Sequence, residues 1–243
     1  MTSLLPIVNE YKLHYKDLEF WVPYWINEPG TPEGPLAGKG RPAELQSQLN
    51  KLIQEYQDPL KSGEEVRYLM LRNGLGVDCS GMVYYVLDTY LERNYQTNLA
   101  KHLVVQRSEL LAAMEKSSWQ KVAKAEVEGW PDAVPMSQVC ERFEKDPIYI
   151  TNVARLCDEV TSVSVKNGEL KIGDMLYLKN VYGGHIAIVA EVNGDSVLCA
   201  DSRFDPVGPG GIRLSETSRQ DPQISPKYKI ERICRLKVLD AAE

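Results

Sequence analysis

Cys79 and its neighbours offer the clearest chemistry in the chain. The sequence Asp78-Cys79-Ser80-Gly81 precedes apolar residues at helical spacing, and Asp78 is a residue type that commonly caps a helix N-terminus. Cys79 is therefore expected in the first turn of a helix, where free backbone N–H groups and the helix dipole favour the reactive thiolate, although the charge of Asp78 opposes it. This position predicts a nucleophile. A small apolar residue packed under a helix is the alternative.

A cysteine nucleophile needs a base, and the chain has three histidines. His14 and His102 lie among charged residues, whereas His185 follows two glycines and opens the run His-Ile-Ala-Ile-Val-Ala. A ring at the start of a strand, beside small residues, lets another group approach closely. If a Cys–His pair exists, we expect Cys79 with His185. A core histidine that binds a backbone carbonyl is the alternative.

A third polar group must orient the base, and the hairpin after His185 supplies Asp201 and Ser202. A two-residue turn at Asn193-Gly194 would place Ser202 opposite His185, whereas a three-residue turn would place Asp201 there. Because a carboxylate stabilises an imidazolium better than a hydroxyl does, we favour Asp201, with Ser202 second. A solvated acid at a strand end is the alternative for Asp201.

Two periodicities divide the chain into helices and strands. Helical spacing predicts helices at residues 43–56, 64–71, 79–93, 104–116 and 136–145. After residue 159, short segments rich in β-branched residues predict strands at 160–165, 170–178, 185–192, 196–202, 211–214 and 228–239. Helices first and strands afterwards indicate an α+β fold, in which the Cys79 helix packs on a C-terminal antiparallel sheet.

The predicted organisation has two parts. Residues 1–62 form an accessory segment with aromatic clusters, a proline- and glycine-rich loop at 28–42 and one helix. Residues 63–243 form the catalytic domain, with a polar helical insertion at about 95–165. Because residues 20–25 are too apolar for a free tail, we expect them to pack on the main body or to line its cleft.

The composition limits the partners and the chemistry. With 243 residues and a net charge of −6, the chain has no electrostatic reason to bind nucleic acid or anionic lipid. It has no apolar run long enough for a membrane span and no leader sequence, so we expect a cytoplasmic protein, with non-classical export or phage release as alternatives. Its five cysteines form neither a disulfide framework nor a zinc motif, so no metal or other cofactor is expected.

Three blocks of sequence together resemble the NlpC-type cysteine peptidases. They are Asp-Cys-Ser-Gly at 78–81, Leu-Lys-Ile-Gly-Asp-Met-Leu-Tyr at 170–177 and Gly-His-Ile-Ala-Ile-Val at 184–189. The related CHAP amidases share this order, and the resemblance covers residues 69–239. It implies a papain-like fold and a thiol protease or amidase that hydrolyses peptidoglycan stem peptides, of the γ-D-glutamyl-diamino acid endopeptidase type, without a cofactor.

The resemblance also implies roles for individual residues. Cys79 matches the nucleophile, His185 the base and Asp201 the third polar residue. Asp78 and Ser80 match groups that bind the free amine of the substrate's L-alanine. The expected partner is a peptide or muropeptide, and no oligomeric state is predicted. A thiol acyltransferase, a lipid amidase and a catalytically silent binding or immunity module are the alternative functions on the same fold.

Overall fold

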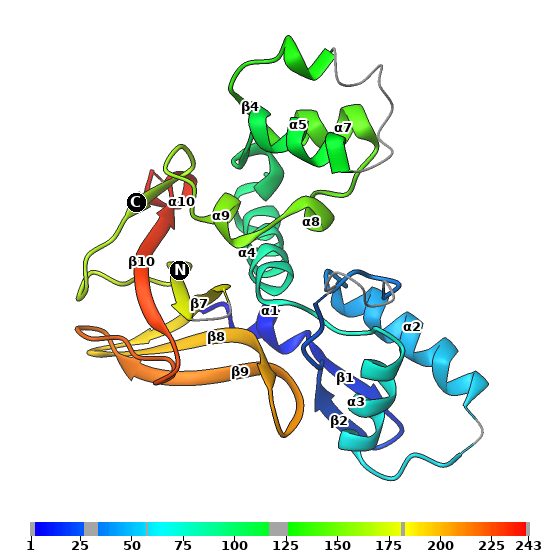
Figure 1. Cartoon of the computed structure of the whole chain (residues 1–243). Coiled ribbons are helices and arrows are strands. Elements are labelled where there is room, and N and C mark those ends of the chain that lie inside the picture. Colours follow the sequence, from blue (N-terminus) through cyan, green and yellow to red (C-terminus); the bar gives the residue numbers. More distant parts are fainter. Residues whose placement is uncertain (1–2, 27–33, 57, 117–125, 181–182, 242–243) are drawn as a thin grey trace.

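The computed structural model describes residues 3–26, 34–56, 58–116, 126–180 and 183–241. These residues form a mixed α and β fold around helix α4 (Cys79–Tyr95). In Figure 1 a six-stranded sheet, coloured yellow to red, lies on one side of α4, and the blue and cyan N-terminal elements lie on the other. The predicted combination of helices with an antiparallel sheet is confirmed.

The large sheet has the strand order β5-β10-β6-β7-β8-β9, and every neighbouring pair is antiparallel. Consecutive hairpins join β6 to β9, while β10 returns to the other side of β6. Helix α4 contacts β7 and β8, so the helix that begins at Cys79 packs against the strands that carry His185 and Asp201. The strands are β5 (Ser162–Ser164), β6 (Met175–Asn180), β7 (Gly183–Asn193), β8 (Ser196–Asp205), β9 (Gly208–Ser218) and β10 (Lys229–Leu236).

The β7–β8 hairpin uses neither of the two predicted turns. Asn193 pairs with Ser196, so the turn consists of Gly194 and Asp195. Gly194 has φ +62°, a left-handed conformation that glycine adopts without the strain a side chain would add. The turn therefore lies one residue later than the prediction placed it.

A β-bulge then shifts the register of this hairpin by one residue. The shift lies between Val189 and Glu191, so Ala190 has no partner in β8. The backbone carbonyl of Ala190 instead accepts a hydrogen bond from the Leu4 N–H at 2.9 Å. The start of the chain is thus attached to the bulge.

The N-terminal segment shares its core with α4. It contains α1 (Leu5–Asn9), a hairpin of β1 (Lys12–Tyr15) and β2 (Leu18–Trp21) that was not predicted, and α2 (Pro42–Glu55), which is followed by α3 (Gly63–Arg72). The last two confirm the helices predicted at 43–56 and 64–71. Buried Val22 and Leu45 belong to the same hydrophobic cluster as Met82 of α4. Of the predicted loop at 28–42, residues 28–33 lie outside the described residues.

The insertion begins with a strand rather than the predicted helix. Val104 and Val105, both β-branched, pair with β4, and the helix starts only at Arg107, whose N–H binds the Asp132 carbonyl at 2.8 Å. The elements are η1 (Leu99–Lys101), β3 (Val104–Gln106), α5 (Arg107–Lys116), β4 (Ala133–Pro135), α7 (Met136–Phe143), α8 (Pro147–Ile150) and α9 (Val153–Leu156). Helices α8 and α9 contact α4, so the insertion is anchored on the helix that begins at Cys79.

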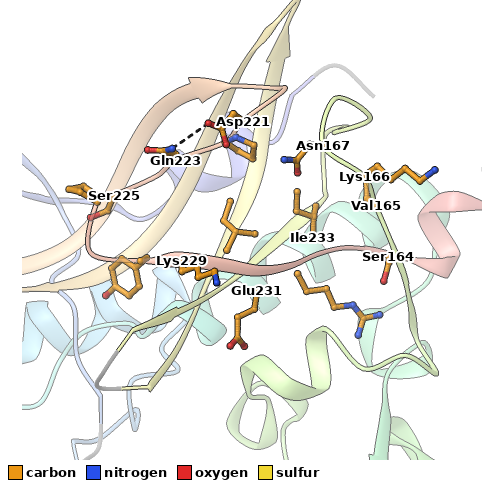
Figure 2. A pocket seen from close by; sticks show the side chains of 15 residues that line it. Ser164, Val165, Lys166, Asn167, Asp221, Gln223, Ser225, Lys229, Glu231 and Ile233 are labelled. Atoms are coloured by element: carbon orange, nitrogen blue, oxygen red, sulfur yellow. Dashed lines mark hydrogen bonds between the residues drawn. The ribbon is translucent and has the colours of Figure 1, made fainter.

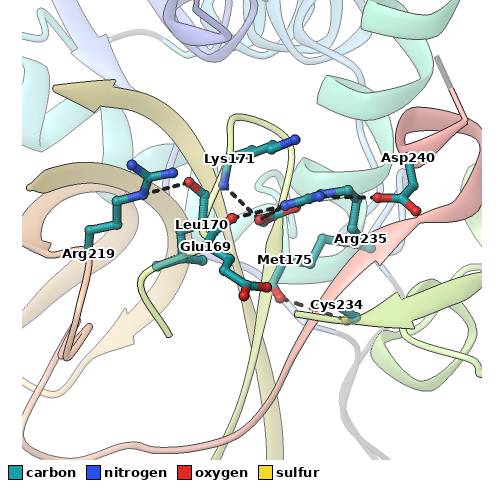
Figure 3. Close-up of polar contacts among 9 residues, drawn as sticks. Glu169, Leu170, Lys171, Met175, Arg219, Cys234, Arg235 and Asp240 are labelled. Carbon is teal, nitrogen blue, oxygen red and sulfur yellow. Dashed lines mark hydrogen bonds and ion pairs between the residues drawn. The ribbon is translucent and has the colours of Figure 1, made fainter. Parts of the chain in front are cut away.

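A buried ion pair fixes the turn that precedes β6. The predicted strand at 170–178 begins only at Met175, because Asp174 accepts the Lys171 N–H at 2.8 Å and closes a turn. The Asp174 carboxylate also receives Nε and Nη2 of Arg235 at 2.7 and 2.9 Å, and Arg235 reaches the Glu169 carbonyl at 3.1 Å. Figure 3 shows these contacts, which join the start of β6 to the end of β10. Helix α10 (Lys237–Asp240) follows.

Candidate active site

Cys79 is the first residue of α4. Asp78 caps the helix, since its Oδ1 accepts the Gly81 N–H at 2.7 Å and its carbonyl accepts the Met82 N–H at 3.1 Å. The N–H of Cys79 has no acceptor within the helix, because the first turn of any α-helix leaves such groups free. The thiol therefore lies beside a free donor and the positive end of the helix dipole.

The N-terminal segment encloses the turn that leads into Cys79. The Val77 N–H binds the Pro23 carbonyl at 3.1 Å, and the Trp25 N–H approaches the Val77 carbonyl at 3.4 Å. A Cβ added to Gly76 would lie 2.6 Å from Cβ of Trp25 and 2.7 Å from the Pro23 oxygen, so only glycine fits there. Residues 22–25 thus pack directly against the main body.

His185 lies within hydrogen-bonding distance of both other members of the site. Its Nε2 is 2.7 Å from Oδ2 of Asp201, and its ring also hydrogen-bonds the Cys79 side chain. One face of the ring stacks on Tyr228, with centroids 4.8 Å apart and an interplanar angle of 28°. All three side chains are buried. The contacts of the ring bring Cys79, His185 and Asp201 together in the structure.

The surroundings of His185 favour its charged form. Burial lowers the pKa of the imidazole, because a charged ring is poorly solvated there. The hydrogen bonds to Asp201 and Cys79, together with their negative charges, outweigh burial and raise the pKa to about 9. At neutral pH the ring is an imidazolium that hydrogen-bonds Asp201 and Cys79.

The bulge in β7 determines which polar residue reaches the base. Asp201 pairs with Ala187. His185 precedes Ala187 by two residues and therefore lies on the same face of β7. The Asp201 carboxylate is thus the diagonal neighbour of the ring. Ser202 points to the other face, where its hydroxyl donates to the Val77 carbonyl at 2.7 Å. Asp201, which the sequence analysis favoured over Ser202, thus lies beside His185, although neither predicted register forms.

Arg203 is a charged neighbour of the site that sequence reasoning missed. Its Nε lies 3.3 Å from Oδ2 of Asp201, and its Nη2 donates to the Ser215 hydroxyl at 3.1 Å. The guanidinium thus faces the same carboxylate oxygen that contacts His185. The strand alternation was a usable signal, because Arg203 follows Asp201 by two residues and therefore shares its face of β8.

Asp78 and Ser80, the residues predicted to bind a substrate amine, hold an ammonium of the chain itself. Nζ of Lys39 lies 2.9 and 2.7 Å from the two carboxylate oxygens of Asp78 and 2.5 Å from Oγ of Ser80. All three side chains are buried. Lys39 belongs to the glycine-rich sequence Ala-Gly-Lys-Gly, which carries no local signal for a contact 39 residues further along the chain.

A cavity of about 770 Å³ adjoins the site at the ring of Tyr228. Tyr228 lines the cavity and stacks on His185. Figure 2 shows its largely polar walls, which include Asn167, Gln223 and Glu231. A polar molecule in this cavity would therefore lie next to the base with a single aromatic side chain between them.

The other four cysteines are buried free thiols that do not contact His185, although Cys199 lies only two residues before Asp201 on β8. Burial raises the pKa of Cys140 to about 11 and that of Cys199 to about 12, because a thiolate is poorly solvated in those surroundings. Cys157 and Cys234 hydrogen-bond each other, which raises the pKa of Cys157. A thiol with a high pKa is a poor nucleophile at neutral pH, so Cys140, Cys157 and Cys199 have a structural role.

In those parts of the chain that the structure describes, no three His, Cys, Asp or Glu side chains are grouped to hold a metal ion. Nor does any helix in the described ranges combine the length and apolar character that crossing a bilayer requires. Comparison of the chain with protein-family models, with curated proteins and with solved structures found no match.

Proposed function

We propose that this protein is a cysteine hydrolase that cleaves amide bonds and that its catalytic domain has a papain-like arrangement. The observation that carries the proposal is the buried line formed by the thiol of Cys79, the ring of His185 and the carboxylate of Asp201. A helix start supplies the thiol, and two neighbouring strands supply the base and the acid. Nucleophilic catalysis by cysteine requires this order of groups.

The reaction begins from the thiolate–imidazolium pair. The Cys79 sulfur attacks the carbonyl carbon of the amide, so a C–S bond forms and the carbonyl oxygen becomes an oxyanion. His185 then gives its proton to the leaving nitrogen, and the C–N bond breaks with release of an amine. Water, deprotonated by the neutral imidazole, attacks the thioester, and the acid product leaves as the thiolate is restored.

Backbone groups at the helix start stabilise the oxyanion in this mechanism. The Cys79 N–H has no intrahelical acceptor and lies next to the sulfur that attacks, so it is the natural donor. Asp201 holds the imidazolium during the first step, and the guanidinium of Arg203 lies beside that carboxylate. The mechanism uses no metal and no other cofactor.

The proposed substrate class is a peptide, in particular a peptidoglycan stem peptide. The three sequence blocks that resemble NlpC-type peptidases support this class. The polar walls of the cavity beside Tyr228 also suit a peptide better than the long acyl chain of a lipid. For this reason we favour an amide hydrolase over a lipid amidase or a thiol acyltransferase.

Mass spectrometry of a muropeptide digest tests the proposal. The wild-type protein should release new peptide fragments, and Cys79→Ala should release none while keeping the circular dichroism spectrum of the wild type. Cys140→Ala, which removes a buried thiol of the insertion, is the matched control and should retain turnover. If Cys79→Ala cleaves at the wild-type rate, the protein is not a cysteine hydrolase.

A further inference from the structure

Lys39, whose side chain fills the space between Asp78 and Ser80, is held rigidly by its surroundings. The Lys39 N–H binds the Leu36 carbonyl at 2.7 Å, and the Asp78 N–H binds the Gly38 carbonyl at 2.7 Å. The stem of Lys39 packs on Gly81, where an added Cβ would lie 3.1 Å from Cδ and 3.2 Å from Cα of the lysine. Lys39 is therefore a fixed part of the helix start rather than a mobile surface side chain.

The polar atoms of this cluster satisfy one another. An ammonium has three N–H donors, and Nζ of Lys39 donates hydrogen bonds to Oδ1 of Asp78 and Oγ of Ser80 while it forms an ion pair with Oδ2 of Asp78. Oδ1 of Asp78 also accepts the Gly81 N–H at 2.7 Å and the Ser80 hydroxyl at 3.0 Å. The site is shaped for an ammonium, and the chain supplies its own.

A second cation has no reason to enter this cluster. Lys39, Asp78 and Ser80 are 8%, 6% and 5% exposed, so a new ammonium would lose its water there. The Asp78 charge is already balanced by Lys39, so no free anion would compensate for that loss. Asp78 precedes Cys79 and Ser80 follows it, so the cluster lies beside the nucleophile. The cluster thus favours a neutral substrate group over a cation at this position.

We propose that Lys39 determines specificity by occupying this ammonium site, so that the substrate group that lies beside the site must be neutral. Substrates with a blocked, N-acylated amine would be accepted, and those with a free amine near Cys79 would be disfavoured. The choice of substrate rests on the proposed hydrolase function. The ammonium site itself stands on the contacts of Lys39 and is tested without any turnover.

Binding of n-propylammonium to Lys39→Ala tests the site. This substitution removes three methylene groups and the ammonium, which together correspond to n-propylammonium. The midpoint of thermal unfolding of Lys39→Ala should rise with n-propylammonium chloride until it saturates, and n-propanol of the same size should not reproduce the rise. The double variant Lys39→Met/Asp78→Asn, which has no buried charge to compensate, should not respond, and neither should the wild type.

Each outcome of this binding test counts for or against the site. An equal response in all three proteins would mean a general salt effect and would overturn the ammonium site, as would a folded Lys39→Ala that does not respond. If Lys39→Ala is unfolded in buffer, refolding by n-propylammonium supports the site. Failure to refold at any concentration counts against it.

Paired substrates test the role in specificity. The tripeptide L-Ala-γ-D-Glu-diaminopimelate and its N-acetylated form should be compared with the wild type and with Lys39→Ala. The wild type should favour the acetylated form, and the ratio of kcat/KM values should shift toward the free amine by about ten- to a hundredfold in Lys39→Ala, the range expected for one charge-assisted contact. An unchanged ratio would contradict the role of Lys39.

The two arms separate failure of the inference from failure of the proposed function. If neither peptide nor a muropeptide digest is cleaved by any variant, the hydrolase proposal fails while the n-propylammonium result still stands. If peptides are cleaved and the wild type prefers the free amine, the hydrolase proposal survives. Lys39 would then have no role in excluding cations.

Discussion

Asp201 pairs with Ala187 in the sheet, yet its carboxylate lies 2.7 Å from the ring of His185. The contact is diagonal, between residues that share one face of neighbouring strands. Ser202 occupies the opposite face and binds the turn before Cys79. Two adjacent polar residues therefore have separate tasks, one electrostatic and one structural.

This separation predicts different consequences for two substitutions. Asp201→Asn should lower kcat, because the amide preserves the shape but removes the charge that stabilises the imidazolium, and it should also lower the unfolding free energy below pH 6.5, where the charged ring stabilises the fold. Ser202→Ala should retain kcat and lose about 1 kcal/mol of unfolding free energy, the usual contribution of one hydrogen bond. Steady-state kinetics and urea unfolding measure both effects. A Ser202→Ala enzyme with lower kcat than Asp201→Asn would reverse the assignment of the third residue.

Alkylation by iodoacetamide should single out Cys79. Cys79 lies at a helix start beside His185, whereas burial raises the pKa of Cys140 to about 11 and that of Cys199 to about 12, so labelling at pH 6–7 should be confined to Cys79. His185→Ala should slow this labelling. Peptide mapping by mass spectrometry locates the label, and Cys140 and Cys199 should stay unmodified in the folded protein. Equal labelling of all three cysteines at pH 6.5 would show that Cys79 has no special reactivity.

The raised pKa of His185 predicts how stability depends on pH. Its folded-state pKa of about 9 lies above the ordinary value of 6.5, so the charged ring stabilises the fold fully below pH 6.5, and this contribution is lost as the pH rises toward 9. The full contribution is on the order of 3 kcal/mol. Urea unfolding of the wild type between pH 6 and 9.5 should show this decline, and His185→Gln should flatten it. Parallel curves for the two proteins would contradict the raised pKa.

The pair of Asp174 and Arg235 should stabilise the sheet through charge compensation. Asp174→Asn leaves a buried guanidinium without its carboxylate, which should cost about 3–5 kcal/mol of unfolding free energy. The double variant Asp174→Leu/Arg235→Met removes both charges and should be more stable than Asp174→Asn alone. Urea unfolding of the three proteins tests this, and purely additive losses would exclude a coupled pair.

The features that could be predicted from the sequence are those with local signals. The cap at Asp78 and the helical spacing after it predicted α4, and the β-branched run after His185 predicted β7. Asp201 was favoured on chemical grounds alone. The hairpin of β1 and β2 was missed because it was interpreted as aromatic clusters.

Lys39 could not be predicted, because its role depends on contacts between segments distant in the sequence. Nothing in Ala-Gly-Lys-Gly distinguishes a buried ammonium from a solvated one. The register of the β7–β8 hairpin was unpredictable for a related reason. It depends on the bulge at Ala190, whose carbonyl is paired with the backbone of Leu4 at the other end of the chain.

That bulge makes the active site sensitive to changes in chain length. If Ala190 paired with Cys199 and the bulge were lost, Ser202 would lie opposite Ala187, and Asp201 would turn to the other face of the sheet. Deletion of one residue of β8 between Leu198 and Asp201, with the bulge kept, would shift the pairing in the same way and exchange the acid for a hydroxyl without altering any of the three residues at the site. Loss of the first few residues, including Leu4, would remove the partner that holds the bulge. A shift of one residue in this pairing would thus change the polar group beside His185.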